Sequence, residues 1–206
     1  MKNLSNYCAV ALLAFSFASC GGGQPDTTKD AKDSNMVKMD SAGTVSDSSK
    51  MATTSSIPAS VSKDDATFVV NTANAGMTEI QAGQVAGQKG MAKDVKDYGA
   101  MMVKDHTMAA DKLKAIAASK NITLPPAISP DMQKNIDDLQ KKDGKDFDKA
   151  YLSMMVDDHK KVISMFEDEA KNGSDADIKA FANSTLPTLR QHLDEAQKCE
   201  KMAKKM

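Results

Sequence analysis

The order of hydrophobic and polar positions divides the chain into two unlike parts near residue 63. From there onward, apolar residues recur at intervals of three and four, which is the spacing of an amphipathic helix. Each such stretch carries one apolar stripe, so the sequence predicts an all-α domain over residues 63–206, built as a four-helix bundle. We predict long helices over 64–88, 91–118, 146–171 and 175–203, with a short extra helix over 131–141.

Turn residues indicate how these helices are joined. Gly90 separates the first pair of long helices, and Asn172-Gly173-Ser174-Asp175 separates the second pair. Because such residues end one helix and begin the next, both pairs should be antiparallel hairpins. The middle connection is long and proline-rich, so the sequence leaves open whether the second and third long helices run parallel. Glycines at positions 76, 83 and 87 indicate a close approach to the first helix.

The residues before the bundle have the features of an export signal followed by a linker. Lys2 is positively charged, residues 9–18 are apolar, and small residues surround Cys20. The apolar run is too short for a permanent membrane span and resembles a bacterial lipoprotein signal. We therefore expect a lipoprotein signal peptide over residues 1–19 and lipid attachment on Cys20. Residues 20–62 lack an apolar period, which predicts a lipid-anchored disordered tether.

Charge and cysteine content narrow the functional classes. The formal net charge is −1, so the chain lacks the broad positive field that nucleic-acid binding requires. With Cys8 removed in the signal and Cys20 acylated, Cys199 remains as a single thiol. The mature chain would then contain no internal disulfide, and its hydrophobic core must stabilise the fold.

One polar residue on each long helix points toward the predicted core. His106, His159 and His192 fall on or beside the apolar stripes of the last three helices, and Glu79 falls on that of the first. Counting helical rise from the two tight turns places all four within about 12 Å along the bundle axis. They therefore form a candidate metal site. Nearby carboxylates are candidates for outer hydrogen-bond partners of the imidazoles: Asp105, Asp158 and Glu195.

A nine-residue pattern occurs twice, at an offset of 53 residues. Tyr98-x-x-Met101-Met102-Val103-x-Asp105-His106 recurs over residues 151–159 as Tyr-x-x-Met-Met-Val-x-Asp-His. Six identities in nine positions indicate an internal duplication. If the two helices run parallel, both Asp-His pairs face the same interior.

From about Phe68 to Met206 the chain resembles the bacterial domain-of-unknown-function 4142 family, whose members are described as outer-membrane proteins of the ferritin-like group. The resemblance implies a ferritin-like four-helix bundle exported to the cell envelope, and it implies no known reaction. The residues that carry it are Glu79, Asp105-His106-Thr107, Leu124-Pro125, Phe147-Asp148-x-x-Tyr151, His159, Leu186-Pro187 and His192-Leu193.

The inward cluster is compatible with more than one role. Ferritin-like di-iron sites need Glu-x-x-His on two helices, and this chain offers only the reversed His192-x-x-Glu195, which disfavours a di-iron oxidase. A mononuclear site of three histidines and one glutamate would suit Zn, Cu or Fe. The same groups could instead form a buried hydrogen-bond network that sets helix register.

We accordingly expect a non-enzymatic, lipid-anchored envelope protein at the outer membrane of a Gram-negative bacterium. Its first expected role is that of a structural or stress-linked interaction module, and the alternative is a transition-metal-binding or sequestering protein. The expected partner is the membrane, through lipid on Cys20, with no nucleic acid. The sequence identifies neither a protein partner nor a specific task.

Overall fold

The structure of the protein is a computed structural model that describes residues 25–42 and 61–203. Every regular element in these two ranges is a helix, which confirms the all-α expectation. No helix in the described ranges has the length and hydropathy that crossing a bilayer requires. The helices are α1 (Thr27–Ala42), α2 (Lys63–Lys89), α3 (Lys93–Ser119), α4 (Pro130–Gln140), α5 (Gly144–Asn172) and α6 (Ala176–Ala203).

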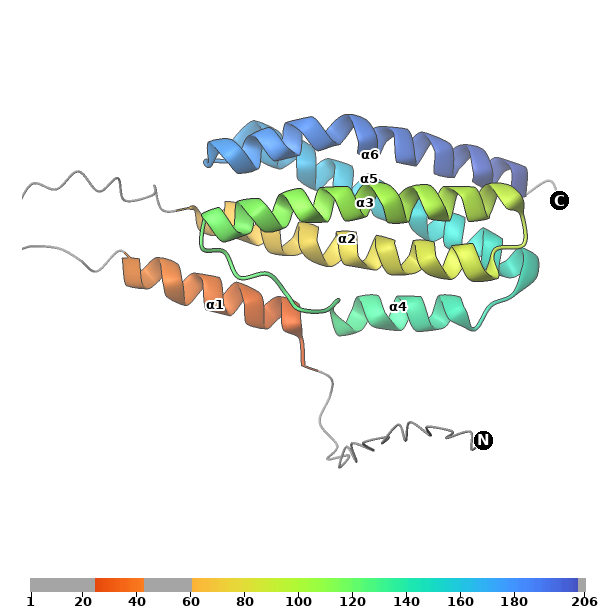
Figure 1. Ribbon diagram of the computed structural model, residues 1–206, viewed down its shortest axis with the longest axis horizontal. Coiled ribbons are helices and arrows are strands. Elements are labelled where there is room, and N and C mark those ends of the chain that lie inside the picture. The colour runs from red at the N-terminus through yellow and green to blue at the C-terminus, as the bar shows by residue number, and fades with distance from the viewer. Residues whose placement is uncertain (1–24, 43–60, 204–206) are drawn as a thin grey trace, which may run out of the picture.

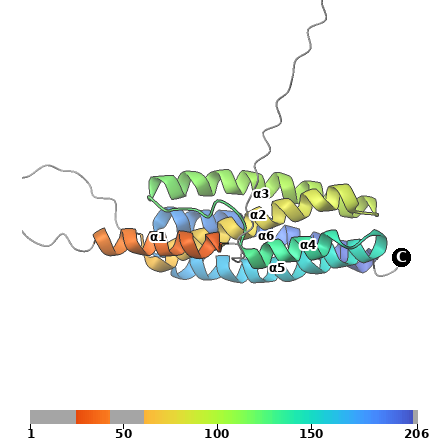
Figure 2. The same ribbon diagram turned by 90° about the horizontal axis from the view of Figure 1, so that it is seen from below.

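The four long helices pack side by side as two hairpins, α2 with α3 and α5 with α6 (Figure 1). Each hairpin closes through a turn of three residues, at 90–92 and 173–175, as the sequence predicts. The connection from α3 to α5 returns along the outside of the molecule and contains α4 (Figures 1 and 2). As a result α3 and α5 run in the same direction (Figure 1). The structure thus answers the question of direction that the sequence leaves open.

The core consists of two apolar clusters that lie on either side of a polar layer. The Tyr–Met cluster lies toward the α2–α3 turn and includes Tyr98, Met102, Tyr151 and Met155. The Phe cluster lies toward the other end of the long helices and centres on aromatic residues that pack in pairs: Phe68, Phe166 and Phe181. Each long helix contributes residues to both clusters, and its inward polar residue lies between these two groups in sequence. The polar residues therefore share one level in the bundle.

The approach of α2 to α3 depends on a pair of glycines. A Cβ atom on Gly83 would lie 2.7 Å from the carbonyl oxygen of Gly99, and one on Gly99 would lie 2.8 Å from that of Gly83. The close approach that the sequence indicates is thus confirmed at Gly83. At Gly76 and Gly87 the added atom would meet nothing within 4 Å, so those two positions are not required by packing.

The prediction of a disordered tether over residues 20–62 is wrong for Thr27–Ala42, which forms α1. This segment lacks an apolar period, and polar contacts hold it against the loop that follows α3. The Asn35 side chain donates to the Thr123 carbonyl oxygen (3.0 Å) and accepts from the Thr123 backbone N–H (2.7 Å). Hydrophobic periodicity cannot reveal a helix that docks in this way. The expected signal, Cys20 and residues 43–60 lie outside the described residues.

Candidate metal centre

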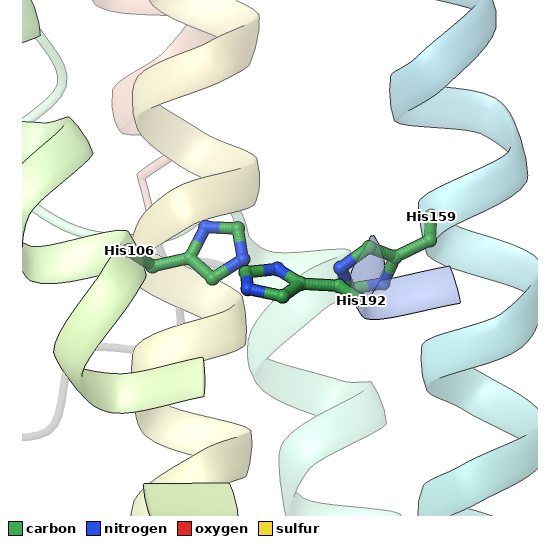
Figure 3. Close-up of side chains that lie close together, drawn as sticks. All are labelled: His106, His159 and His192. Atoms are coloured by element: carbon green, nitrogen blue, oxygen red, sulfur yellow. The ribbon is translucent and has the colours of Figure 1, made fainter. Parts of the chain in front are cut away.

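The polar layer contains one side chain from each long helix: Glu79 from α2, His106 from α3, His159 from α5 and His192 from α6. All four residues are buried between the two apolar clusters. Figure 3 shows the three imidazoles directed toward one another from α3, α5 and α6. Residues far apart in sequence thus meet at one point, as the helical projection predicts.

The three rings are close enough to share one ligand. Their centroids lie 5.2 Å apart for His106 and His192, 5.5 Å for His159 and His192, and 5.9 Å for His106 and His159. Each ring offers a nitrogen such that the three nitrogens lie within 4.8 Å of one another. The three histidines could therefore hold a metal ion.

Each imidazole uses one nitrogen to contact the protein. His106 Nδ1 lies 3.1 Å from Glu79 Oε2, and His192 Nε2 lies 3.0 Å from Asp105 Oδ2. His159 Nδ1 lies 2.8 Å from the Met155 carbonyl oxygen, one turn earlier on α5. Carbonyl and ionised carboxylate oxygens accept hydrogen bonds, so in neutral rings His159 Nδ1 and His192 Nε2 carry the proton, and His106 Nδ1 carries it when Glu79 Oε2 is the acceptor.

The other nitrogen of each ring is left without a hydrogen bond. His106 Nε2, His159 Nε2 and His192 Nδ1 are buried and have no partner among the described residues. Because the protonated nitrogen of each ring is already assigned, these three atoms carry lone pairs. Buried polar atoms are nearly always paired in folded proteins. These three nitrogens in one layer are therefore candidate ligand atoms for a cation.

Burial disfavours the charged forms of Glu79, His106 and His159 in this layer. It lowers the pKa of His106 to about 3, with the other two histidines adding to the shift. It also lowers the pKa of His159 to about 4. Burial, with the nearby charge of Asp158, raises the pKa of Glu79 to about 8. Neutral imidazole is the form that binds a metal, so His106 and His159 need lose no proton at neutral pH.

The three predicted outer carboxylates have different partners in the structure. Asp105 bonds to His192 across the bundle and not to its sequence neighbour His106. Asp158 contacts no histidine among the described residues: it pairs with Lys161 at 3.8 Å, and its charge acts on Glu79. Glu195 pairs with Lys198 on the surface of α6 and lies outside the layer. One of the three therefore orients an imidazole.

Two contacts of the layer escape a reading of the sequence. The Met155 carbonyl that orients His159 is a backbone group, which side-chain patterns cannot reveal. The Tyr98 hydroxyl donates to the His192 carbonyl oxygen at 3.2 Å. The sequence signal that points to this tyrosine is its place in the duplicated pattern. Equivalent residues of the two copies face each other across the bundle, as Tyr98 faces Tyr151 with ring centroids 6.0 Å apart.

A family model described as Domain of unknown function (DUF4142) matches residues 50–199. The chain belongs to this family. The matched range contains all four residues of the polar layer and excludes α1, so the layer lies in the family's domain and α1 precedes it. No curated protein and no solved structure matches the chain.

Proposed function

We propose that this member of the family binds a divalent transition-metal ion through His106, His159 and His192. Two observations carry the proposal: the three buried imidazoles offer nitrogens within 4.8 Å of one another, and each ring has one nitrogen without a hydrogen bond among the described residues. The sequence ranks a structural module first and metal binding second. The geometry favours the second, because a network that served only to set helix register would pair its buried atoms.

The surroundings of the imidazoles match those of known metal ligands. Histidine ligands usually donate their second N–H to a carboxylate or a backbone carbonyl, which fixes the ring and its tautomer. Glu79, Asp105 and the Met155 carbonyl take these places for His106, His192 and His159. Such an arrangement holds each ring in one orientation before a cation arrives.

The donor set suits a metal of borderline softness, namely Zn, Cu or Fe. Nitrogens of a tetrahedral zinc site lie about 3.3 Å apart, compared with the 4.8 Å within which the three nitrogens lie here. Metal binding therefore requires the three nitrogens to move closer together. Glu79 Oε1 is also buried without a hydrogen-bond partner among the described residues and lies 3.6 Å from His159 Nδ1, which makes it a candidate for a fourth position once its proton is lost.

The wider setting that we propose is a ferritin-like four-helix bundle held at the outer membrane by lipid on Cys20. The two hairpins and the parallel direction of α3 and α5 support the fold. Six residues separate Cys20 from Thr27, the start of α1, and they span at most about 25 Å. Lipid on Cys20 with α1 docked would therefore keep the bundle near the membrane surface. We assign the bundle a binding role and no reaction.

Metal content tests the proposed site directly. Protein purified without chelator, or reloaded with Zn²⁺, should contain one ion per chain by elemental analysis, and the triple His→Ala variant should contain none. Cys199→Ala is the control for binding by the buried thiol, and it should retain the metal. Circular dichroism checks that each variant is folded. A metal-free wild type that gains no thermal stability with Zn²⁺, Cu²⁺ or Fe²⁺ would contradict the proposal and leave a hydrogen-bond network.

The anchor needs a separate test. Mass spectrometry of protein extracted from membranes should find a chain that begins at Cys20 and carries lipid. Cys20→Ser should appear in the soluble fraction. A native amino terminus without lipid, at any residue, would refute acylation.

A further inference from the structure

A pocket between α2, α4 and α5 reaches the edge of the polar layer. α4 lies along α2 and α5 on the outside of the long helices (Figure 2). The pocket has a volume of about 100 Å³, and its walls include Thr78 and Glu79 from α2, Met132 from α4, and Asp158 and Lys161 from α5. Glu79 thus belongs both to the polar layer and to the inner wall of this pocket.

An open groove between α4 and α5 adjoins this pocket. The groove has a volume of about 300 Å³, and its lining includes Asp138 and Leu139 from α4 and Asp157 from α5. Asp158 and Lys161 line both the groove and the pocket. The two hollows therefore meet at these two side chains and together lead from solvent to Glu79.

Asp158 places a carboxylate at the junction of groove and pocket. Its side chain is 22% exposed, and Oδ1 lies 3.8 Å from Lys161 Nζ, whose side chain is 78% exposed. An exposed ion pair of this length contributes little free energy, so Lys161 can turn into solvent when another cation approaches Asp158. The carboxylate is thus accessible from the groove.

A second hollow approaches the layer from the side of α3 and α6, and its walls have a different character. It is a cavity of about 40 Å³ whose lining is apolar apart from Glu79, His106 and two threonines. A metal ion that moved through it would lose water ligands without a carboxylate to replace them before it met the layer itself, which is costly. The approach beside α4 is therefore the more favourable one for a cation.

We infer that a divalent cation enters the buried site through the groove and pocket beside α4, with Asp158 as the residue that attracts it. This inference rests on the proposed function. Glu79 is 2% exposed and closes the inner end of the pocket, so its side chain must move for the ion to reach the histidines. Asp158 is a positioning residue for uptake and does not hold the bound ion.

Rates of metal uptake and release test the role of Asp158. Stopped-flow mixing of metal-free protein with Co²⁺ measures uptake through the visible bands of the bound ion, and a chelator measures release. Asp158→Asn should slow uptake about three- to tenfold and reduce its dependence on salt, because it removes a charge that attracts the ion. Release should not become faster. Lys161→Gln should speed uptake by a similar factor. Asp111→Asn, exposed on α3, is the matched control and should behave as wild type.

A larger side chain in the pocket tests the path itself. Met132 lines the pocket beside α4 and not the cavity on the other side. Met132→Trp should slow uptake and release by the same factor and leave the Kd unchanged, since an obstacle on a path acts equally in both directions. Ala109→Leu narrows the apolar cavity instead and should change neither rate. Circular dichroism checks that each variant is folded.

The outcomes separate the two proposals. Failure of the wild type to bind Co²⁺ would overturn the proposed function. Co²⁺ binding with unchanged uptake in Asp158→Asn or in Met132→Trp would overturn the entry route alone. Slower uptake in Ala109→Leu would place the entry on the side of α3 and α6, and faster release in Asp158→Asn would make Asp158 a ligand of the bound ion. Either result would also overturn the route.

Discussion

Two sets of buried polar side chains in this protein differ in how fully they are paired. Asp65 and Asp148 are each 1% exposed, and both oxygens of each carboxylate accept backbone N–H groups at 2.9–3.0 Å. Asp148 on α5 holds the turn that enters α3, and Asp65 on α2 holds the turn that enters α6. The histidines of the polar layer are as deeply buried, yet each leaves one nitrogen unpaired.

This difference in pairing distinguishes residues that stabilise the fold from residues that are available to bind a ligand. A buried group whose atoms are all paired inside the chain stabilises the fold and has nothing left for a ligand. A buried group that leaves an atom unpaired lowers stability until something binds it. The turn aspartates are of the first kind and the imidazoles of the second, so substitutions in the two sets should have opposite consequences for folding and for metal binding.

The largest expected effect follows the loss of a turn aspartate. Asp148→Ala leaves the N–H groups of Met91 and Ala92 without their acceptors, and it should lower the free energy of unfolding by about 3 kcal/mol. Chemical denaturation measures this. The exposed Asp146→Ala is the control, with a change within about 0.5 kcal/mol. Metal stoichiometry should stay at one in both variants, and its loss in a folded Asp148→Ala protein would contradict the division of roles.

A smaller and local effect is expected at Asn35, whose amide is paired on both atoms with Thr123. Asn35→Ala should weaken the docking of α1 by about 1–2 kcal/mol. Hydrogen exchange should then become faster in α1 and stay unchanged in α2, α3, α5 and α6. The exposed Asp33→Ala serves as the control. Equal acceleration in the long helices would show that α1 is part of the cooperative core.

Replacement of a layer histidine should change the metal-free protein little. His159→Leu removes an unpaired buried nitrogen and fills a similar volume, so the free energy of unfolding should stay within about 1 kcal/mol of wild type or rise. Zn²⁺ should no longer stabilise the variant. A loss of about 3 kcal/mol without metal would indicate that the layer is a structural network after all.

A further prediction concerns pH and a carboxyl group far from the histidines. Burial and the neighbouring Asp65 carboxylate raise the pKa of Glu169 from 4.5 to about 7. The folded state thus holds a proton that the unfolded state releases near pH 4.5. The resulting stability is present in full below pH 4.5 and is lost as pH rises through about 7. Glu169→Gln should flatten this part of the pH–stability curve, and an unchanged slope would contradict the shift.

The sequence predicts the long helices and the inward layer because both depend on periodicity. His106, His159 and His192 lie on apolar stripes, and the tight turns set their common level. The direction of α5 relative to α3 could not be predicted, since it depends on the path of a long connection. Nor could α1, because Asn35 docks through backbone atoms of a loop more than eighty residues away.

The sequence likewise predicts where individual side chains lie but not which residues they contact. Asp105 and Asp158 occupy equivalent places in the duplicated sequence, yet only Asp105 bonds to a histidine. Its partner is His192 on α6, whereas the residue on α2 that interacts with Asp158 is Glu79. The duplication therefore predicts where these carboxylates lie on α3 and α5. Their partners come from α6 and α2, which lie outside the duplicated pattern.

The most direct test of the metal site is a crystal structure of the Zn²⁺-loaded protein with anomalous diffraction at the zinc edge. We predict one peak in the buried layer, about 2.1 Å from His106 Nε2, His159 Nε2 and His192 Nδ1. A layer without a peak, or a zinc ion bound instead by the opposite ring nitrogens or on the surface, would contradict the assignment.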